Sequence, residues 1–145
     1  MSRPEAPRRG DYRIFYPIAT RWGDNDVYGH VNNVVYYAWF DCAVNRYLME
    51  AGGLDYEGDG TVGFVVSSGC EYLAPVRFPE AVEAGLRVDR LGGSSVRYGV
   101  GIFRAGEDSA CAFGHFVHVF VDRTSNRSVP IPGALRDALE ALAAP

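Results

Sequence analysis

One segment, residues 33–51, constrains the fold of this chain more than any other. It reads NVVYYAWFDCAVNRYLMEA, and 14 of its 19 positions are apolar. A helix with so few polar residues should bury most of its circumference. A surface helix would leave that apolar area in water, whereas a curved sheet wrapped around the helix would cover it. We therefore expect one long central helix enclosed by a sheet.

Signals at both ends of the segment support this helix. Asn32 or Asn33 can cap a helix that begins near residue 34, because the asparagine side chain accepts hydrogen bonds from first-turn N–H groups. Gly52 and Gly53 follow the segment, where a left-handed C-cap costs glycine little. The predicted helix spans residues 34–51.

Most of the remaining chain has the pattern of β-strands. Apolar and polar residues alternate over residues 81–91, and Gly92-Gly93 then predicts a hairpin turn. A short amphipathic helix is expected at residues 133–143. Together with the long helix, these elements predict an α+β fold with a mainly antiparallel sheet of about five strands. The predicted strands are residues 12–20, 62–72, 81–91, 94–104 and 109–122, the last apolar enough to be covered on both faces.

Length and composition set the outer bounds. A chain of 145 residues fits one domain, predicted at residues 12–145, after a charged, proline-containing lead-in at residues 1–11 that we expect to be disordered. The formal net charge of −4 gives no electrostatic reason to expect nucleic-acid binding. No segment resembles a signal peptide or a membrane span, so a cytoplasmic location follows by elimination.

The cysteine and histidine patterns argue against a metal centre. Cys42, Cys70 and Cys111 are odd in number and lack CxxC spacing, which also argues against a disulfide framework. His115 and His118 are three residues apart in a predicted strand, so they should point to opposite faces. We expect no metal and no cofactor.

A polar cluster lies immediately before the long helix. Asp24, Asp26 and His30 fall within seven residues. The first turn of a helix leaves backbone N–H groups unpaired, and such a group can bind the oxyanion that forms when a carbonyl is attacked. A nearby carboxylate can activate water or attack directly. Since Asp and Asn before helices are most often caps and turn formers, the pattern alone does not choose a reaction.

The motif around this cluster is similar to that of a known family. RWGDNDVYGHVNNVVYY (residues 21–37) resembles the signature of the 4-hydroxybenzoyl-CoA thioesterase-like branch of the hotdog superfamily. YLAPVRF (residues 72–78) and VFVD (residues 119–122) are also similar to it. The resemblance implies a hotdog fold, in which a sheet wraps one helix. It also implies hydrolysis of an acyl-CoA or acyl-carrier-protein thioester, with coenzyme A as part of the substrate.

Residue roles are carried over from the motif. Asp26 matches the family's catalytic carboxylate, which acts as nucleophile or general base. Asn33 matches the helix residue whose N–H polarises the thioester carbonyl. His30 and Asn32 match a subset of the family that acts on acyl-CoA, and we take His30 as catalytic and Asn32 as substrate-binding. Asp24 is left as a loop organiser.

The resemblance also implies a homodimer or homotetramer with the active site at a subunit interface. The coenzyme A arm is expected to lie along the partner subunit, near the Gly92-Gly93 hairpin. Ser68 and Glu71 are expected to line the pocket opposite the helix. Tyr36 is a further substrate-binding candidate, although helix aromatics more often fill the core. The candidates for the coenzyme A arm are Arg90, Ser94 and Ser95.

Two other functions remain open from the sequence. Hotdog enoyl-thioester hydratases use an Asp and His pair before the helix, but their motif places asparagine and proline between the two, where this chain has Val27-Tyr28-Gly29. A non-catalytic acyl-thioester-binding protein is the other alternative, and the presence of Asp26 argues against it.

Overall fold

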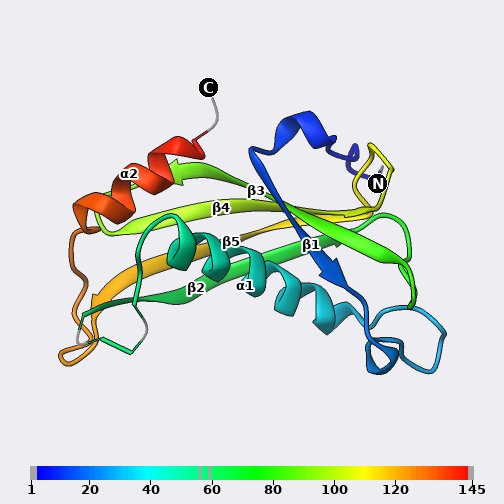
Figure 1. The fold of residues 1–145 in the computed structure, drawn as a ribbon, viewed down its shortest axis with the longest axis horizontal. Helices are drawn as coiled ribbons and strands as arrows, with labels where there is room; N and C mark the ends of the chain where they lie inside the picture. Colours follow the sequence, from blue (N-terminus) through cyan, green and yellow to red (C-terminus); the bar gives the residue numbers. More distant parts are fainter. Residues whose placement is uncertain (1–2, 56, 59, 144–145) are drawn as a thin grey trace.

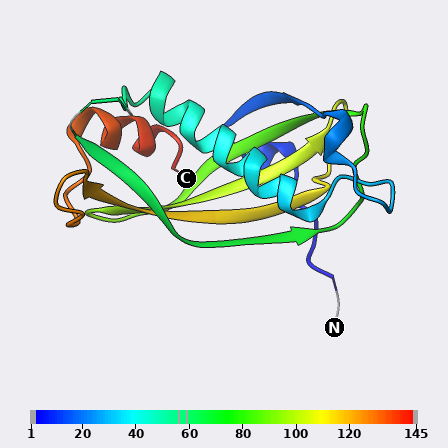
Figure 2. The same ribbon diagram turned by 90° about the horizontal axis from the view of Figure 1, so that it is seen from below.

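A computed structural model describes residues 3–55, 57–58 and 60–143. A five-stranded antiparallel sheet carries helix α1 (Asn33–Glu50) across one face, as Figures 1 and 2 show. This confirms the predicted α+β hotdog architecture. The other elements are η1 (Arg9–Asp11), β1 (Ile14–Ala19), η2 (Trp22–Asp24), β2 (Thr61–Tyr72), β3 (Ala81–Leu91), β4 (Ser95–Arg104), β5 (Ala112–Asp122) and α2 (Gly133–Ala141).

The strand order β1-β3-β4-β5-β2 leaves β1 and β2 at the two edges of the sheet. Strands β3 and β4 are joined by the predicted Gly92-Gly93 hairpin, closed by the N–H of Gly92 to the carbonyl of Ser95 at 2.8 Å. Strand β2 pairs with β5 over its whole length, and the register shifts once, between Val65 and Ser67. Strands β2 to β5 run roughly along the long axis of the molecule in Figure 1, so the sheet has two well-separated ends.

Helix α1 buries one face rather than most of its circumference. Phe40, Val44 and Leu48, spaced four residues apart, are fully buried against the sheet. Each such side chain contributes about 1.5–3 kcal/mol to stability. The opposite face carries exposed apolar residues, including Val34 (64% exposed) and Met49 (52% exposed). The prediction of near-complete burial was therefore wrong for a single chain, because the sheet covers the helix from one side only.

The ends of helix α1 agree with the prediction. Asn32 is the N-cap, and its Oδ1 accepts the N–H of Val34 at 3.1 Å. Beyond the last turn, Gly53 has φ +70°, a conformation that disfavours a side chain. No helix in the described ranges is long and apolar enough to cross a membrane.

The N-terminal segment differs from the expected disordered lead-in. Residues 3–11 lie against the sheet, while residues 1–2 are outside the described part of the chain. The carbonyl of Pro7 accepts the N–H of Ala110 at 2.9 Å, Arg8 pairs with Asp108 at 2.6 Å, and Arg9 pairs with Glu83 at 2.9 Å. These long-range partners cannot be read from local composition. Ser109 and Ala110, which were predicted to belong to the last strand, pair with Arg8 and Pro7 instead, and β5 starts at Ala112.

Candidate active site at the start of helix α1

The loop that precedes helix α1 is organised by Asp24. This carboxylate is only 1% exposed and accepts the N–H of Arg21 at 2.8 Å, while the Arg21 guanidinium contacts it at 2.9 Å. The carbonyl of Asp24 in turn accepts the N–H of Asn32, the N-cap residue, at 2.9 Å. Asp24 therefore holds the loop against the start of the helix, which is the role expected for it.

Asp26 lies in a tight turn next to this anchor. Its N–H donates to the carbonyl of His30 at 2.9 Å, and its carbonyl accepts the N–H of Gly29 at 3.0 Å. Its half-buried carboxylate accepts the N–H of Tyr28 at 2.9 Å. A carboxylate can accept about four hydrogen bonds, so this contact orients the group while leaving it able to accept a proton.

The N–H groups in the first turn of helix α1 differ in whether they have a hydrogen-bond acceptor. Those of Val34 and Val35 are bonded to the side chain and the carbonyl of Asn32. Asn33 stands first in the helix, where the backbone ladder offers its N–H no acceptor. Within the described residues, the structure gives this N–H no hydrogen-bond partner. An N–H in this position can bind a developing oxyanion.

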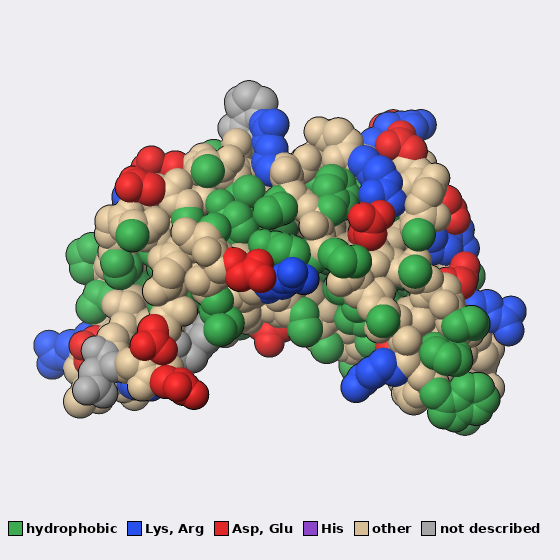
Figure 3. Space-filling model, in the orientation of Figure 1, with side chains coloured by type: hydrophobic (Ala, Val, Ile, Leu, Met, Phe, Trp, Pro, Cys, Tyr) green, Lys and Arg blue, Asp and Glu red, His purple; other side chains and the backbone are tan. Residues whose placement is uncertain are grey.

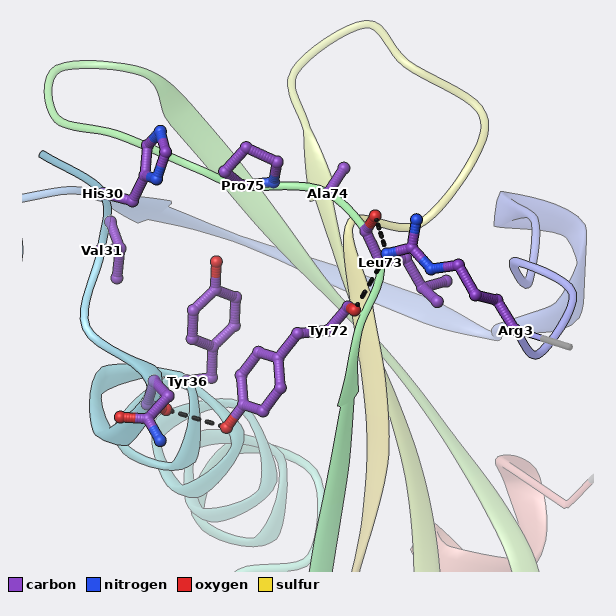
Figure 4. Close-up of a pocket in the computed structure, with 9 residues that line it drawn as sticks. Arg3, His30, Val31, Tyr36, Tyr72, Leu73, Ala74 and Pro75 are labelled. Carbon is purple, nitrogen blue, oxygen red and sulfur yellow. Dashed lines mark hydrogen bonds between the residues drawn. The ribbon is translucent and has the colours of Figure 1, made fainter. Parts of the chain in front are cut away.

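A cavity of about 240 Å³ opens beside this helix start (Figure 4). The phenol of Tyr72 donates to the carbonyl of Asn33 at 3.0 Å and thereby ties the end of β2 to the helix. The Tyr36 and Tyr72 rings meet edge to face at 5.0 Å, and burial raises the pKa of Tyr36 to about 12, so this phenol stays protonated. The cavity is lined by Arg3, His30, Val31, Asn33, Tyr36, Tyr72, Leu73, Ala74 and Pro75.

Three predicted site residues, His30, Asn33 and Tyr36, line this cavity together. Asp26 does not line the cavity in the single chain, but its backbone N–H donates to the carbonyl of His30, which does. Asn32 acts on the helix start as a cap. Sequence reasoning missed Tyr72 and Arg3 as lining residues. Tyr72 lies in a motif that resembles the family, which was a usable signal, whereas the sequence around Arg3 gave none.

Ser68 and Glu71 are not brought together. In the β2–β5 register, Ser68 lies opposite Phe116, which packs on helix α1. Glu71 lies opposite Phe113 and borders a separate cavity of about 290 Å³ with His115 and two arginines. Residues three apart on a strand point to opposite faces, so the expectation that both line one pocket needs correction.

Arg90, Ser94 and Ser95 lie at the other end of the sheet from the helix start. The helix start lies at the opposite end of strands β3 and β4. Each strand is about ten residues long, which corresponds to roughly 33 Å. Within one chain these residues and Asn33 therefore cannot contact the same thioester group.

The two strand histidines point to opposite faces, as predicted. His118 is 1% exposed on the helix side, where its Nδ1 lies 3.1 Å from the phenol of Tyr98, and burial lowers its pKa to about 4. His115 lies opposite Gly69 on the other side of the sheet. In the ranges that the structure describes, no three His, Cys, Asp or Glu side chains gather as a metal site would require.

Comparisons with known proteins agree with this architecture. The model of the thioesterase-like superfamily matches residues 20–139. The crystal structure of the PA5185 protein from Pseudomonas aeruginosa strain PAO1 has 60% identity and a TM-score of 0.95, covering 96% of this chain and 97% of that one. The BH1999 gentisyl-coenzyme A thioesterase has 25% identity and a TM-score of 0.77, covering 87% of this chain and 99% of that one. The protein YsmA of Bacillus subtilis (strain 168) is 27% identical over 119 residues, which are 81% of this chain and 79% of YsmA.

Proposed function

Because this chain belongs to the thioesterase-like superfamily and is a thioester hydrolase, we propose that its substrate is an acyl-CoA and that Asp26 is its catalytic carboxylate. An acyl-carrier-protein thioester offers the same reacting group and belongs to the proposal. The similarity to a gentisyl-coenzyme A thioesterase supports the coenzyme A thioester. Coenzyme A enters as part of the substrate, and the reaction requires no cofactor.

The single observation that carries the proposal is the N–H of Asn33 at the open start of helix α1, beside a cavity. A thioester carbonyl placed there would direct its oxygen at this donor, and the helix dipole would favour the negative charge that develops on it. His30 and Tyr36 line the same cavity and are proposed to contact the substrate. Asn32 serves the site by capping the helix that carries the donor.

Two routes use the same residues. In one, Asp26 removes a proton from water, the hydroxide adds to the carbonyl carbon, and the C–S bond breaks to release the thiolate. In the other, the Asp26 carboxylate displaces the thiolate to form an anhydride, which water then hydrolyses. Both routes give a free acid and a thiol, and both bring the developing charge to the N–H of Asn33.

We further propose that the functional unit is a homodimer or homotetramer paired through β2. This edge strand exposes the apolar side chains of Phe64, Val65 and Val66 (47, 46 and 61% exposed), and an unpaired apolar edge is a template for pairing with a second chain. Exposed Trp22, Val27 and Tyr28 add apolar surface on the loop beside the helix start. Figure 3 shows hydrophobic side chains gathered at the lower right corner of the molecule, where this loop lies in Figure 1.

A two-fold axis at β2 would make the paired edges antiparallel. The Thr61 end of one β2 would then lie near the Tyr72 end of the other. This brings the partner's far end, with its hairpin residues Arg90, Ser94 and Ser95, toward Asn33, which accounts for their proposed contact with the coenzyme A arm. Asp26, which does not line the single-chain cavity, would be enclosed by the same pairing.

The interface proposal predicts the effect of a charge on β2. Val66→Asp should convert the assembly into monomers of 15.9 kDa and remove most thioesterase activity, because an unpaired carboxylate cannot be buried there. Sedimentation velocity and free-thiol release measure the two effects. Met49→Asp, at an exposed apolar position of helix α1, is the matched control and should retain both properties. A wild-type protein that sediments as a monomer would contradict the interface.

The proposed activity predicts release of free thiol from acyl-CoA substrates. A panel that varies acyl length and includes aryl groups is read with a thiol reagent, and at least one substrate should be turned over. Crotonyl-CoA separates the alternatives: loss of the enoyl absorbance without thiol release would indicate a hydratase, and tight binding without either change a non-catalytic binding protein. A cytoplasmic location remains part of the proposal, and cell fractionation would test it.

A further inference from the structure

The cavity at the helix start has a cationic side chain at one end. The Nη2 of Arg3 donates to the carbonyl of Leu73 at 2.6 Å and lies 3.4 Å from the carbonyl of Tyr72. In Figure 4, Arg3 and His30 lie at opposite ends of the run Leu73–Pro75, with the Tyr36 and Tyr72 rings between them. Arg3 therefore reaches the cavity from a segment far from the other lining residues in sequence.

The guanidinium of Arg3 has different partners from those of the nearby arginines. Arg8 and Arg9 of the same segment form ion pairs with Asp108 and Glu83. The partners of Arg3 are neutral carbonyls, and no carboxylate of the described chain is within ion-pair distance of it. A guanidinium has five N–H donors in a rigid fork, so fixing Nη2 on the backbone orients the remaining donors for an anion.

The position of Arg3 indicates where that anion is on the substrate. Tyr72 links Arg3 to Asn33. The Nη2 of Arg3 lies 3.4 Å from the carbonyl of Tyr72, and the phenol of Tyr72 donates to the carbonyl of Asn33 at 3.0 Å. Arg3 and Asn33 are therefore separated by about the length of one tyrosine side chain. In a coenzyme A thioester, the whole pantetheine arm separates the phosphates from the reacting carbonyl, and this arm is longer. An anion that reaches Arg3 while the carbonyl is at Asn33 therefore belongs to the acyl group.

We propose that Arg3 binds a terminal carboxylate on the acyl group, which makes the substrates thioesters of dicarboxylic acids. This inference rests on the proposed thioesterase function and names the substrate class of the same site. The cavity between the two ends suits the linking methylenes, because its walls are the apolar side chains and rings of Val31, Leu73, Ala74, Pro75, Tyr36 and Tyr72. The acyl chain lies along these walls, and Arg3 forms an ion pair with its terminal carboxylate.

Adipoyl-CoA and heptanoyl-CoA test this inference, since they have similar acyl lengths and differ in the terminal carboxylate. The wild type should prefer adipoyl-CoA. Arg3→Ala should lower kcat/KM for adipoyl-CoA about ten- to hundredfold, the range for losing a hydrogen bond to a charged group, and change heptanoyl-CoA less than twofold. Arg3→Lys should recover part of the loss. Arg13→Ala, at an exposed arginine outside the cavity lining, is the matched control and should leave both values unchanged.

The outcomes distinguish a failure of the proposed thioesterase function from a failure of the proposed carboxylate site. If the wild type releases thiol from no acyl-CoA, the proposed function fails. If it hydrolyses heptanoyl-CoA but Arg3→Ala affects both substrates equally, or if adipoyl-CoA is not preferred, the function stands and the carboxylate site is overturned. Equal losses on both CoA thioesters that disappear with the pantetheine thioesters would assign Arg3 to the coenzyme A phosphates instead, which also overturns the proposal.

Discussion

Asp26→Asn is expected to lower kcat for thioester hydrolysis by about 10²- to 10⁴-fold, the usual effect of removing a positioned acid–base group. The amide cannot take a proton from water and is not a nucleophile. Its oxygen can still accept the N–H of Tyr28, which the carboxylate accepts at 2.9 Å in the wild type, so the turn should persist. Free-thiol release gives kcat, and thermal unfolding should show a midpoint close to that of the wild type.

The control for this variant is Asp41→Asn. Asp41 is an exposed carboxylate on helix α1 that accepts the side-chain amide of Asn45 at 2.8 Å and is outside the cavity lining. Its replacement should leave kcat within about twofold of the wild type, as expected for a surface substitution away from any special feature. An Asp26→Asn enzyme that keeps wild-type turnover on every hydrolysed acyl-CoA would exclude Asp26 from the chemistry.

The elements of this fold were predictable because their signals are local. The apolar run of helix α1, its Asn32 cap and the glycines at its end are read within the segment itself. The alternation in β3 likewise depends on neighbouring residues only. The resemblance of residues 21–37 to a family motif then supplied the global fold, which no single local pattern could specify.

Features that depend on pairing between distant residues were not predictable. The sequence does not show that Glu71 faces away from Ser68 into another cavity, because the face of a strand is set by its register with β5. Nor does it show that the hairpin residues lie at the far end of the sheet from Asn33. The order of the N-terminal segment depends on partners about 100 positions away, such as Asp108 for Arg8. Local composition predicted disorder there for that reason.

Gly114→Ala is expected to destabilise the protein by about 3 kcal/mol or more, at the upper end of the usual range for overpacking. Gly114 lies in β5 between Val100 and Cys70, on the face that meets helix α1. An added Cβ would overlap the carbonyl oxygen of Gly69 and lie 2.8 Å from Cε2 of Phe40. A backbone oxygen cannot move aside by a change of rotamer. For a domain of this size the melting temperature should fall by roughly 6–12 °C, as read by circular dichroism.

Gly133→Ala provides the matched control for this prediction. Gly133 is the first residue of helix α2, its φ is not in the left-handed region, and an added Cβ would meet no atom within 4 Å. The same change should therefore be neutral or stabilising by up to about 1 kcal/mol, because alanine restricts the unfolded chain. The difference between the two variants isolates steric overlap from the loss of a glycine. Equal melting temperatures would mean that β2 and helix α1 can both move away from β5 at Gly114, and the steric explanation would then fail.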